Sequence, residues 1–223
     1  MRATAIVPVK RFGAAKQRLS DVLAPEQRAA LAAAMLSDVL EALAEAELVE
    51  RVLVVSGEPR VAELVGGRDA DLLDDPADAG HSEAALIGVS AALTRGAGCV
   101  ALLPGDCPLL KSGELDRAIA AATEGSVGVV PDRHGSGTNG LILRPPDLIG
   151  PAFGPGSRER HLRLASEVGT EAVVLGIESL GLDLDTGGDL LELRRIVEAG
   201  ELDGSATAAA VLALDQAAGT GSR

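Results

Sequence analysis

Four cationic side chains gather near the start of an otherwise acidic chain: Lys10, Arg11, Lys16 and Arg18. The whole chain has 33 Asp and Glu against 20 Lys and Arg, a formal net charge of -13. The cluster directly follows residues 3–9, an apolar run typical of a buried strand, and it includes small residues that let a ligand approach the backbone, namely Gly13, Ala14 and Ala15. Ligands of open α/β proteins bind beyond the carboxyl ends of strands. The segment therefore predicts a pocket for a polyanion, most simply a nucleoside triphosphate, against the alternative of a solvated loop.

Three aspartates are candidates for holding a metal ion beside such phosphates. Asp106 follows residues 99–104, another apolar strand, and so lies at the carboxyl edge of the predicted sheet. Asp183 and Asp185 are separated by one residue, so in an extended segment their side chains point to the same side. Mg²⁺ prefers one or two carboxylates together with phosphate oxygens and water. The alternative roles are a turn residue before Pro108 for Asp106, and helix capping for the later pair.

A glycine-rich loop, residues 135–140, matches the G-x-G-x-x-G spacing of dinucleotide sites. That fingerprint must follow a strand and open a helix, whereas residues 141–143 have the pattern of a strand, so we reject the dinucleotide interpretation. The loop still offers backbone N–H groups and the side chains of Ser136, Thr138 and Asn139, which suit a carboxylate or a phosphate. The alternative is an ordinary hairpin loop.

Two predicted helix starts supply further candidates for ligand contacts. Ser157 is a good N-cap after residues 153–156, and Arg158 and Arg160 follow in the first turn, where the N-terminus of a helix favours an anion. The sequence fits two interpretations of this helix start equally well: a phosphate site, and a capped helix with surface arginines. His81 opens an earlier helix, where it could contact a nucleobase or a phosphate or have a structural role, and no catalytic role is assigned to it.

Composition argues against several other classes of protein. The chain has 223 residues, 47% of them hydrophobic, with 2 Phe and no Trp or Tyr. Nucleic-acid binding relies on aromatic stacking and a basic surface, so nucleic acid is not an expected partner. The two cysteines, Cys99 and Cys107, make neither a disulfide framework nor a zinc pattern.

No apolar stretch reaches the length of a membrane span and no secretory leader is visible, so we expect a cytoplasmic protein.

Segments typical of strands and of helices alternate along the chain. Strands are expected at residues 3–9, 51–56, 71–74, 99–104, 127–131, 141–143 and 172–175, and helices at 26–47, 58–65, 82–95, 112–123, from 157 onward and at 189–199. Successive β-α units predict an α/β fold with a mostly parallel mixed sheet and helices on both faces. We expect one domain over residues 1–204. In the tail that follows, 205–223, residues 206–217 could be helical and residues 219–223 are expected to be disordered.

Five motifs occur in a fixed order: Val7-Pro8-Val9-Lys10 through Ala15-Lys16-Gln17-Arg18-Leu19, Leu103-Pro104-Gly105-Asp106-Cys107-Pro108-Leu109, Gly137-Thr138-Asn139, Phe153-Gly154-Pro155-Gly156-Ser157 and Leu184-Asp185-Thr186. Together they resemble the 2-phospho-L-lactate / phosphoenolpyruvate guanylyltransferase family, which acts in the biosynthesis of coenzyme F420. The resemblance implies a nucleotide-diphospho-sugar transferase-like (Rossmann-like) fold. It also implies Mg²⁺-dependent transfer of GMP from GTP to a small phosphorylated three-carbon acid.

The resemblance further implies roles for particular residues. The catalytic group would comprise Lys10, Lys16, Arg18 and Asp106. The nucleotide would contact Pro8, Val9, Lys10, Arg11, Lys16, His81 and Ser82. The acceptor acid would be held by Thr138, Asn139, Gly154 and Ser157, and the Mg²⁺ by Asp106 with one or both of Asp183 and Asp185.

Several alternatives stay open at this point. We favour phosphoenolpyruvate as the acceptor because the composition, rich in Ala and Arg, is typical of a high-GC source. The other candidates are 2-phospho-L-lactate and 3-phosphoglycerate, a base other than guanine, and a nucleotide-binding regulatory module without catalysis. A homodimer is also left open.

Overall fold

The computed structural model describes residues 2–13 and 16–220, and within them the centre of the fold is a seven-stranded sheet. The strands are β1 (Ala3–Pro8), β2 (Val49–Ser56), β3 (Asp71–Asp74), β4 (Val100–Leu102), β5 (Ser126–Pro131), β6 (Thr138–Arg144) and β7 (Ala172–Val174). Their order in the sheet is β3-β2-β1-β4-β6-β5-β7. Strands β1 to β4 run parallel, β6 is antiparallel to both of its neighbours, and β7 is parallel to β5. The predicted mostly parallel mixed sheet is confirmed.

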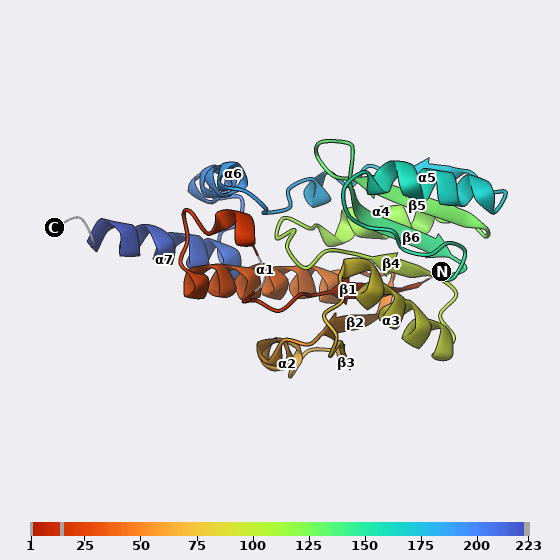
Figure 1. Ribbon diagram of the computed structural model, residues 1–223, viewed down its shortest axis with the longest axis horizontal. Helices are drawn as coiled ribbons and strands as arrows, with labels where there is room; N and C mark the ends of the chain where they lie inside the picture. Colours follow the sequence, from red (N-terminus) through yellow and green to blue (C-terminus); the bar gives the residue numbers. More distant parts are fainter. Residues whose placement is uncertain (1, 14–15, 221–223) are drawn as a thin grey trace.

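Helices cover both faces of this sheet (Figure 1). They are α1 (Pro25–Glu45), α2 (Pro59–Val65), α3 (His81–Thr94), α4 (Ser112–Ala121), α5 (Ser157–Glu167), α6 (Gly187–Glu198) and α7 (Ala206–Thr220), with short 3-10 turns at Gln17–Leu19 and Glu178–Leu180. One apolar cluster joins α1, α2 and α4 to one face of the sheet. A second cluster joins α3 and α5 to the other face, so the prediction of helices on both faces is confirmed.

Strand β1 shows why the whole first segment is apolar. Ala5 and Val7 belong to one apolar cluster and Ile6 to the other, so the strand is buried on both faces, as expected for a central parallel strand. Helix α3 approaches this strand closely, because Gly88 lies against Ile6 and a Cβ there would collide with it. Close contacts of this kind build the core of a chain that has 2 Phe and no Trp or Tyr.

A third apolar cluster lies on the far side of α1, where α6 and α7 pack (Figure 1). It contains Leu19, at the end of the cationic segment, and Leu184, which separates Asp183 from Asp185. Leu184 is buried, and its two neighbours in an extended segment point to the opposite side. One cluster thus anchors both the cationic segment and the pair of aspartates.

A single side chain of α1 caps the start of α7. The carboxylate of Asp38 accepts the N–H groups of Ala206 at 2.9 Å and of Thr207 at 2.8 Å. Carboxylates at this position satisfy N–H groups that a helix leaves unpaired and also interact favourably with its dipole. Helix α7 then buries Val211 and Leu214 in the third cluster.

The predicted elements agree with the structure apart from their ends. Helix α7 extends to Thr220 and so includes Gly219 and Thr220, for which disorder stays a prediction. Residues 221–223, also expected to be disordered, lie outside the described residues, as do Ala14 and Ala15. Across the described ranges, none of the helices combines the length and the apolar character that a membrane crossing needs.

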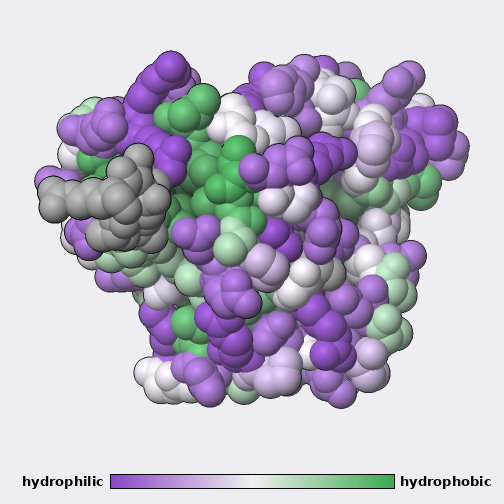
Figure 2. Space-filling model, turned by 60° about the vertical axis from the view of Figure 1, so that its left-hand side comes forward, coloured by the Kyte–Doolittle hydropathy of each residue, from purple (hydrophilic) through white to green (hydrophobic). Residues whose placement is uncertain are grey.

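Figure 2 brings the α6 and α7 end of the molecule forward. Most of this surface is purple, and a green region lies beside the atoms drawn in grey. Three large apolar side chains of the segments at this end are more than half exposed: Val22 at 58%, Leu191 at 55% and Leu212 at 52%. Such side chains on neighbouring segments mark a candidate contact surface.

Candidate active site

A cleft of about 460 Å³ opens at the carboxyl ends of β1 and β4. Its lining comes from the segments that follow these two strands, from the loop between β5 and β6, and from the segments that precede α5 and α6. Sheet edges where strands from different βα units end are the usual place for ligands in open α/β folds. The cleft therefore lies where the sequence predicted a ligand.

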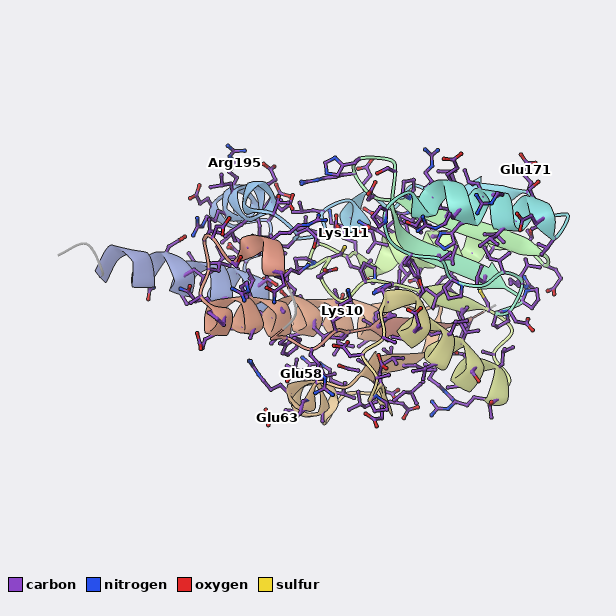
Figure 3. The ribbon with its side chains drawn as sticks, viewed as in Figure 1. Lys10, Glu58, Glu63, Lys111, Glu171 and Arg195 are labelled. Atoms are coloured by element: carbon purple, nitrogen blue, oxygen red, sulfur yellow. The ribbon has the colours of Figure 1, made fainter. Side chains whose placement is uncertain are left out.

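One part of the lining carries the predicted cations Lys10, Lys16 and Arg18, together with Pro8 and Val9. Figure 3 labels Lys10 near the middle of the molecule, whereas Arg195, labelled on the outer side of α6, points to solvent with 73% of its side chain exposed. Arg11 does not line the cleft. It is exposed, and its guanidinium group lies beside Gly57, so the structure brings together only part of the predicted cationic group.

The ammonium group of Lys16 lies between two carboxylates. It pairs with Asp106, and it lies 3.2 Å from Oδ1 of Asp185. Burial alone would lower the pKa of Lys16, but the charges of Asp106 and Asp185 outweigh it and raise that pKa. Burial alone would raise the pKa of Asp106, but Lys16 outweighs it and holds that pKa below its usual value. Lys16 and Asp106 are therefore both charged at neutral pH.

Asp183 adds a third carboxylate to this end of the cleft. Its Oδ1 lies 3.5 Å from Nδ2 of Asn139, and none of the ion pairs among the described residues includes it. Burial raises the pKa of Asp183, and the nearby charge of Asp106 raises it further. Two carboxylates therefore pair with one ammonium group while a third lies nearby, and the surplus of negative charge favours an added cation.

These carboxylates suit a hard divalent cation, although they do not form a closed cage. Within residues 2–13 and 16–220, no three His, Cys, Asp or Glu side chains converge as in a preformed metal site, and Lys16 lies between two of the candidates. Mg²⁺ is commonly held by one or two carboxylates together with the phosphates of a substrate. The donor set fits a metal that arrives with a nucleotide.

The start of α6 fixes the segment that carries the later aspartates. Asp189 is 2% exposed, and one of its oxygens accepts the N–H groups of Asp185 at 3.0 Å and of Thr186 at 2.6 Å. Its other oxygen pairs with Arg133, from the loop between β5 and β6. Thr186 is the N-cap of α6. The capping role considered for Asp183 and Asp185 thus falls to Thr186 and Asp189.

Another part of the lining carries neutral groups, and it contains all four residues predicted to hold the acceptor: Thr138, Asn139, Gly154 and Ser157. The hydroxyl of Thr138 lies 3.0 Å from Nδ1 of His161, and Nδ2 of Asn139 donates to the carbonyl of Leu180 at 2.7 Å. Gly154 has a φ of 106°, a conformation that favours glycine. Backbone geometry and buried hydrogen bonds thus fix these groups.

Helix α5 differs from expectation in two respects. Its N-cap is Gly156, so the assignment of that cap to Ser157 is wrong by one residue. The two arginines of the first turn hold neighbouring loops and do not line the cleft. Nη2 of Arg160 donates to the carbonyl of Ala152 at 2.9 Å, and Nη1 of Arg158 donates to the carbonyl of Gly135 in the β5–β6 loop at 3.1 Å. The two guanidinium groups are therefore not available to a phosphate in the cleft, whereas anion binding by the N–H groups at the start of α5 stays a prediction.

His81 begins α3 and lines the cleft, and its ring packs edge-on against Phe153 with centroids 4.7 Å apart. Burial lowers the pKa of His81, while the charge of Asp106 opposes this shift. Ser82 does not line the cleft. Its Oγ accepts the N–H of Phe153 at 2.9 Å, which ties the start of α3 to the segment before α5.

Sequence reasoning missed several residues of the site: Phe12 and Asp132, which line the cleft, and Arg133, His161 and Asp189, which support it. His161 had a usable signal, because it lies four residues after Ser157 and so shares a helix face with it. Asp189 also had one, since it follows Thr186 at the spacing of a capping box. Nothing in the sequence relates Arg133 to Asp189.

Comparison with known proteins identifies the family. A family profile described as guanylyl transferase CofC like matches residues 3–201. The chain belongs to this family. A CofC-like relative from Conexibacter woesei, named phosphoenolpyruvate guanylyltransferase, is 45% identical over 199 residues, which cover 88% of this chain and 89% of the relative. A protein of the same name from Sphaerobacter thermophilus is 41% identical over 193 residues, covering 86% and 93%.

Solved structures support the same fold for this CofC-like chain. A candidate nucleotide-diphospho-sugar transferase from Desulfovibrio desulfuricans has a TM-score of 0.74 at 19% identity and covers 97% of this chain and 96% of its own. A CMP:2-keto-3-deoxy-manno-octonic acid synthetase complexed with CTP has a TM-score of 0.59 at 16% identity, covering 91% and 100%. The expected nucleotide-diphospho-sugar transferase-like fold is confirmed.

Proposed function

We propose that this chain transfers GMP from GTP to phosphoenolpyruvate and releases pyrophosphate, a reaction that the family resemblance assigns to coenzyme F420 biosynthesis. One observation carries the proposal. A single cleft combines cations for a triphosphate, the Lys16 and Asp106 pair, and a neutral lining suited to a small acid. The relatives named phosphoenolpyruvate guanylyltransferase favour this acceptor over 2-phospho-L-lactate.

The substrates divide between the two parts of the lining. Lys10, Lys16 and Arg18 are assigned to the phosphates of GTP, and Pro8, Val9 and His81 to the rest of the nucleotide. Thr138, Asn139, Gly154 and Ser157 are assigned to the acceptor acid. Arg11 and Ser82 lie outside the cleft lining, so neither is given a direct contact.

Asp106, with one or both of Asp183 and Asp185, would hold Mg²⁺. When bound, a divalent ion neutralises charge on the phosphoryl oxygens and orients them. The ammonium group of Lys16 already contacts two of these carboxylates. In the proposed complex the carboxylates keep Lys16 charged and close to the phosphates, which is the role expected of a cation at a phosphoryl-transfer site.

The chemistry needs no dedicated general base. The acceptor phosphate is largely dianionic at neutral pH, so one of its oxygens can attack the α-phosphorus of GTP directly. A new P–O bond forms as the bond to pyrophosphate breaks. Most of the barrier is then electrostatic, because two anions must be held in line. Lys10, Lys16 and Arg18 lower this barrier by stabilising negative charge on the triphosphate.

The decisive experiment measures pyrophosphate release with GTP and each of three acids: phosphoenolpyruvate, 2-phospho-L-lactate and 3-phosphoglycerate. We expect the largest kcat/KM with phosphoenolpyruvate, and a much lower rate when ATP or CTP replaces GTP. Pockets separate near-isosteric substrates by roughly 10- to 200-fold, so the acids must be compared side by side. GTP binding without pyrophosphate release from any acid would instead identify a regulatory module.

Two finer expectations belong to the same proposal. A homodimer would cover exposed Leu191 and Leu212 at the α6 and α7 end. Light scattering of the wild type and of a Leu191→Asp, Leu212→Asp variant tests this proposal. Identical masses for the two proteins would contradict it.

We also place the enzyme in the cytoplasm, because GTP and phospho-acids are cytoplasmic metabolites.

A further inference from the structure

His161 is a fully buried side chain behind the part of the cleft that carries Thr138. It lies on α5 and is 0% exposed. Its Nδ1 lies 3.0 Å from Oγ1 of Thr138, and its Nε2 accepts the N–H of Ala152 at 2.9 Å. The ring of Phe153 packs against it at a centroid distance of 5.3 Å. His161 therefore connects α5 with the start of β6 and with the segment before α5.

The backbone partner determines which nitrogen of His161 carries the proton. An amide N–H only donates, so Nε2 presents its lone pair and is not protonated. A neutral imidazole then carries its proton on Nδ1, and the doubly protonated ring is excluded. Burial favours the neutral form, since it lowers the pKa of His161 to about 4, with a smaller contribution from the charge of Arg160.

The proton on Nδ1 in turn orients the hydroxyl of Thr138. Because Nδ1–H donates to Oγ1, the oxygen acts as an acceptor there and its own hydrogen points elsewhere. In the part of the chain that the structure describes, the hydroxyl of Thr138 has no other hydrogen-bond partner. Thr138 lines the cleft, so its hydrogen is available to a ligand. Such a donor suits an anionic oxygen of a carboxylate or a phosphate.

We infer that His161 is a positioning residue that holds Thr138 as a hydrogen-bond donor to an anionic oxygen of the acceptor acid. The inference rests on the proposed function, because it takes the ligand at Thr138 to be the phospho-acid. Without Nδ1–H the hydroxyl of Thr138 is free to rotate and can turn a lone pair toward the anion. Removing the Nδ1–H donor should therefore weaken binding of the acid. GTP binding should stay unchanged, because cations elsewhere in the cleft are assigned to the triphosphate.

Two amide substitutions separate this role from a merely structural one. In His161→Asn the amide nitrogen can take the place of Nδ1 and donate to Thr138, while the bond to Ala152 is lost. In His161→Gln the amide oxygen can take the place of Nε2 and accept from Ala152, while the bond to Thr138 is lost. Each variant gives up one buried hydrogen bond, so we expect similar melting temperatures for the two.

Steady-state kinetics, with phosphoenolpyruvate and GTP varied in turn, then test the inference. We expect His161→Gln to raise the KM for phosphoenolpyruvate about tenfold or more with the KM for GTP unchanged, since hydrogen bonds to charged groups are strong. His161→Asn should stay within about threefold of the wild type. Thr138→Val should raise this KM at least as much as His161→Gln, and adding His161→Gln to Thr138→Val should change nothing further, because His161 acts only through the hydroxyl of Thr138. Equal effects of Asn and Gln, or parallel changes in both KM values, would overturn the inference.

Nuclear magnetic resonance tests the proton position without any turnover. The chain has 3 histidines, and the ring ¹⁵N signals of His161 are assigned by their loss in His161→Asn. We expect a protonated Nδ1 and an unprotonated Nε2; the reverse overturns the inference. A wild type that releases no pyrophosphate with any phospho-acid contradicts the proposed function, while the ring signals still report on His161 and Thr138.

Discussion

Lys16 and Asp106 form an ion pair across 90 positions of sequence, between the segment after β1 and the segment after β4. Neighbouring parallel strands bring the two side chains to the same edge of the sheet. The side chain of Lys16 is 6% exposed, so its charge needs a partner. The pair places a permanent positive charge beside the carboxylates proposed to hold a metal.

Replacing Asp106 by Asn should abolish turnover and keep the fold. Lys16 retains Asp185 as a partner at 3.2 Å, so the variant contains no isolated buried cation. We expect kcat/KM to fall by at least about 100-fold, as for other groups that stabilise charge in a transition state, with circular dichroism unchanged. Asp71→Asn is the matched control, since Asp71 forms a surface ion pair with Arg95. Wild-type activity in Asp106→Asn would refute the catalytic assignment.

Replacing Lys16 by Gln should lower stability as well as activity. Asp106 and Asp185 then lack the ammonium group that offsets their charge, and repulsion between the two carboxylates, whose side chains are 31% and 50% exposed, destabilises the folded chain. We expect a lower melting temperature that millimolar Mg²⁺ partly restores in the absence of nucleotide, together with loss of turnover. The wild type should respond less to Mg²⁺ alone. A variant indifferent to Mg²⁺ would argue against a metal at these carboxylates.

Gly154 should tolerate no side chain. Its φ of 106° is strained for any other residue, so Gly154→Ala should cost about 1 to 3 kcal/mol of stability or shift the segment. Either outcome displaces the neutral lining, and we expect a raised KM for phosphoenolpyruvate. Gly150→Ala is the control, because a Cβ there meets nothing within 4 Å. Equal kinetics of the two alanine variants would remove Gly154 from the acceptor site.

Acid should destabilise the protein partly through His161. The pKa of His161 is lowered to about 4 in the folded chain and is about 6.5 in the unfolded chain. Between these values only the unfolded form binds the proton, so its contribution to stability is complete above about pH 6.5 and is lost as the pH falls toward 4.

Urea denaturation at about pH 7 and about pH 5 checks this linkage. The wild type should lose about 2 kcal/mol more than His161→Asn between the two conditions. His81 is present in both proteins, so its own titration cancels in the comparison. An equal loss in both proteins would show that His161 does not titrate as described.

The sequence predicted the strands, the helices and the edge of the sheet that carries the site. Parallel strands are buried on both faces and therefore read as continuous apolar runs, which made β1 and β4 recognisable. Polar residues directly after such runs must meet at the carboxyl edge, so Lys16 and Asp106 could be expected near one another. The burial of Leu184 likewise agrees with the expected orientation of Asp183 and Asp185.

Contacts between segments distant in sequence could not be predicted in the same way. The ion pair of Arg133 with Asp189 depends on how a loop folds over the start of α6. Arg11 adjoins Lys10 in sequence, but its guanidinium group lies beside Gly57 and outside the cleft. Arg160 is a similar case. An arginine in the first turn of a helix can face an anion or its own backbone, and only the path of residues 152–156 decides between them.

The cap that Asp38 places on α7 also bears on the cleft. It holds the start of α7 against α1, and α7 completes the third cluster, which anchors Leu19 and Leu184. A change at Asp38, which does not line the cleft, would therefore loosen the segments that carry Lys16 and Asp185.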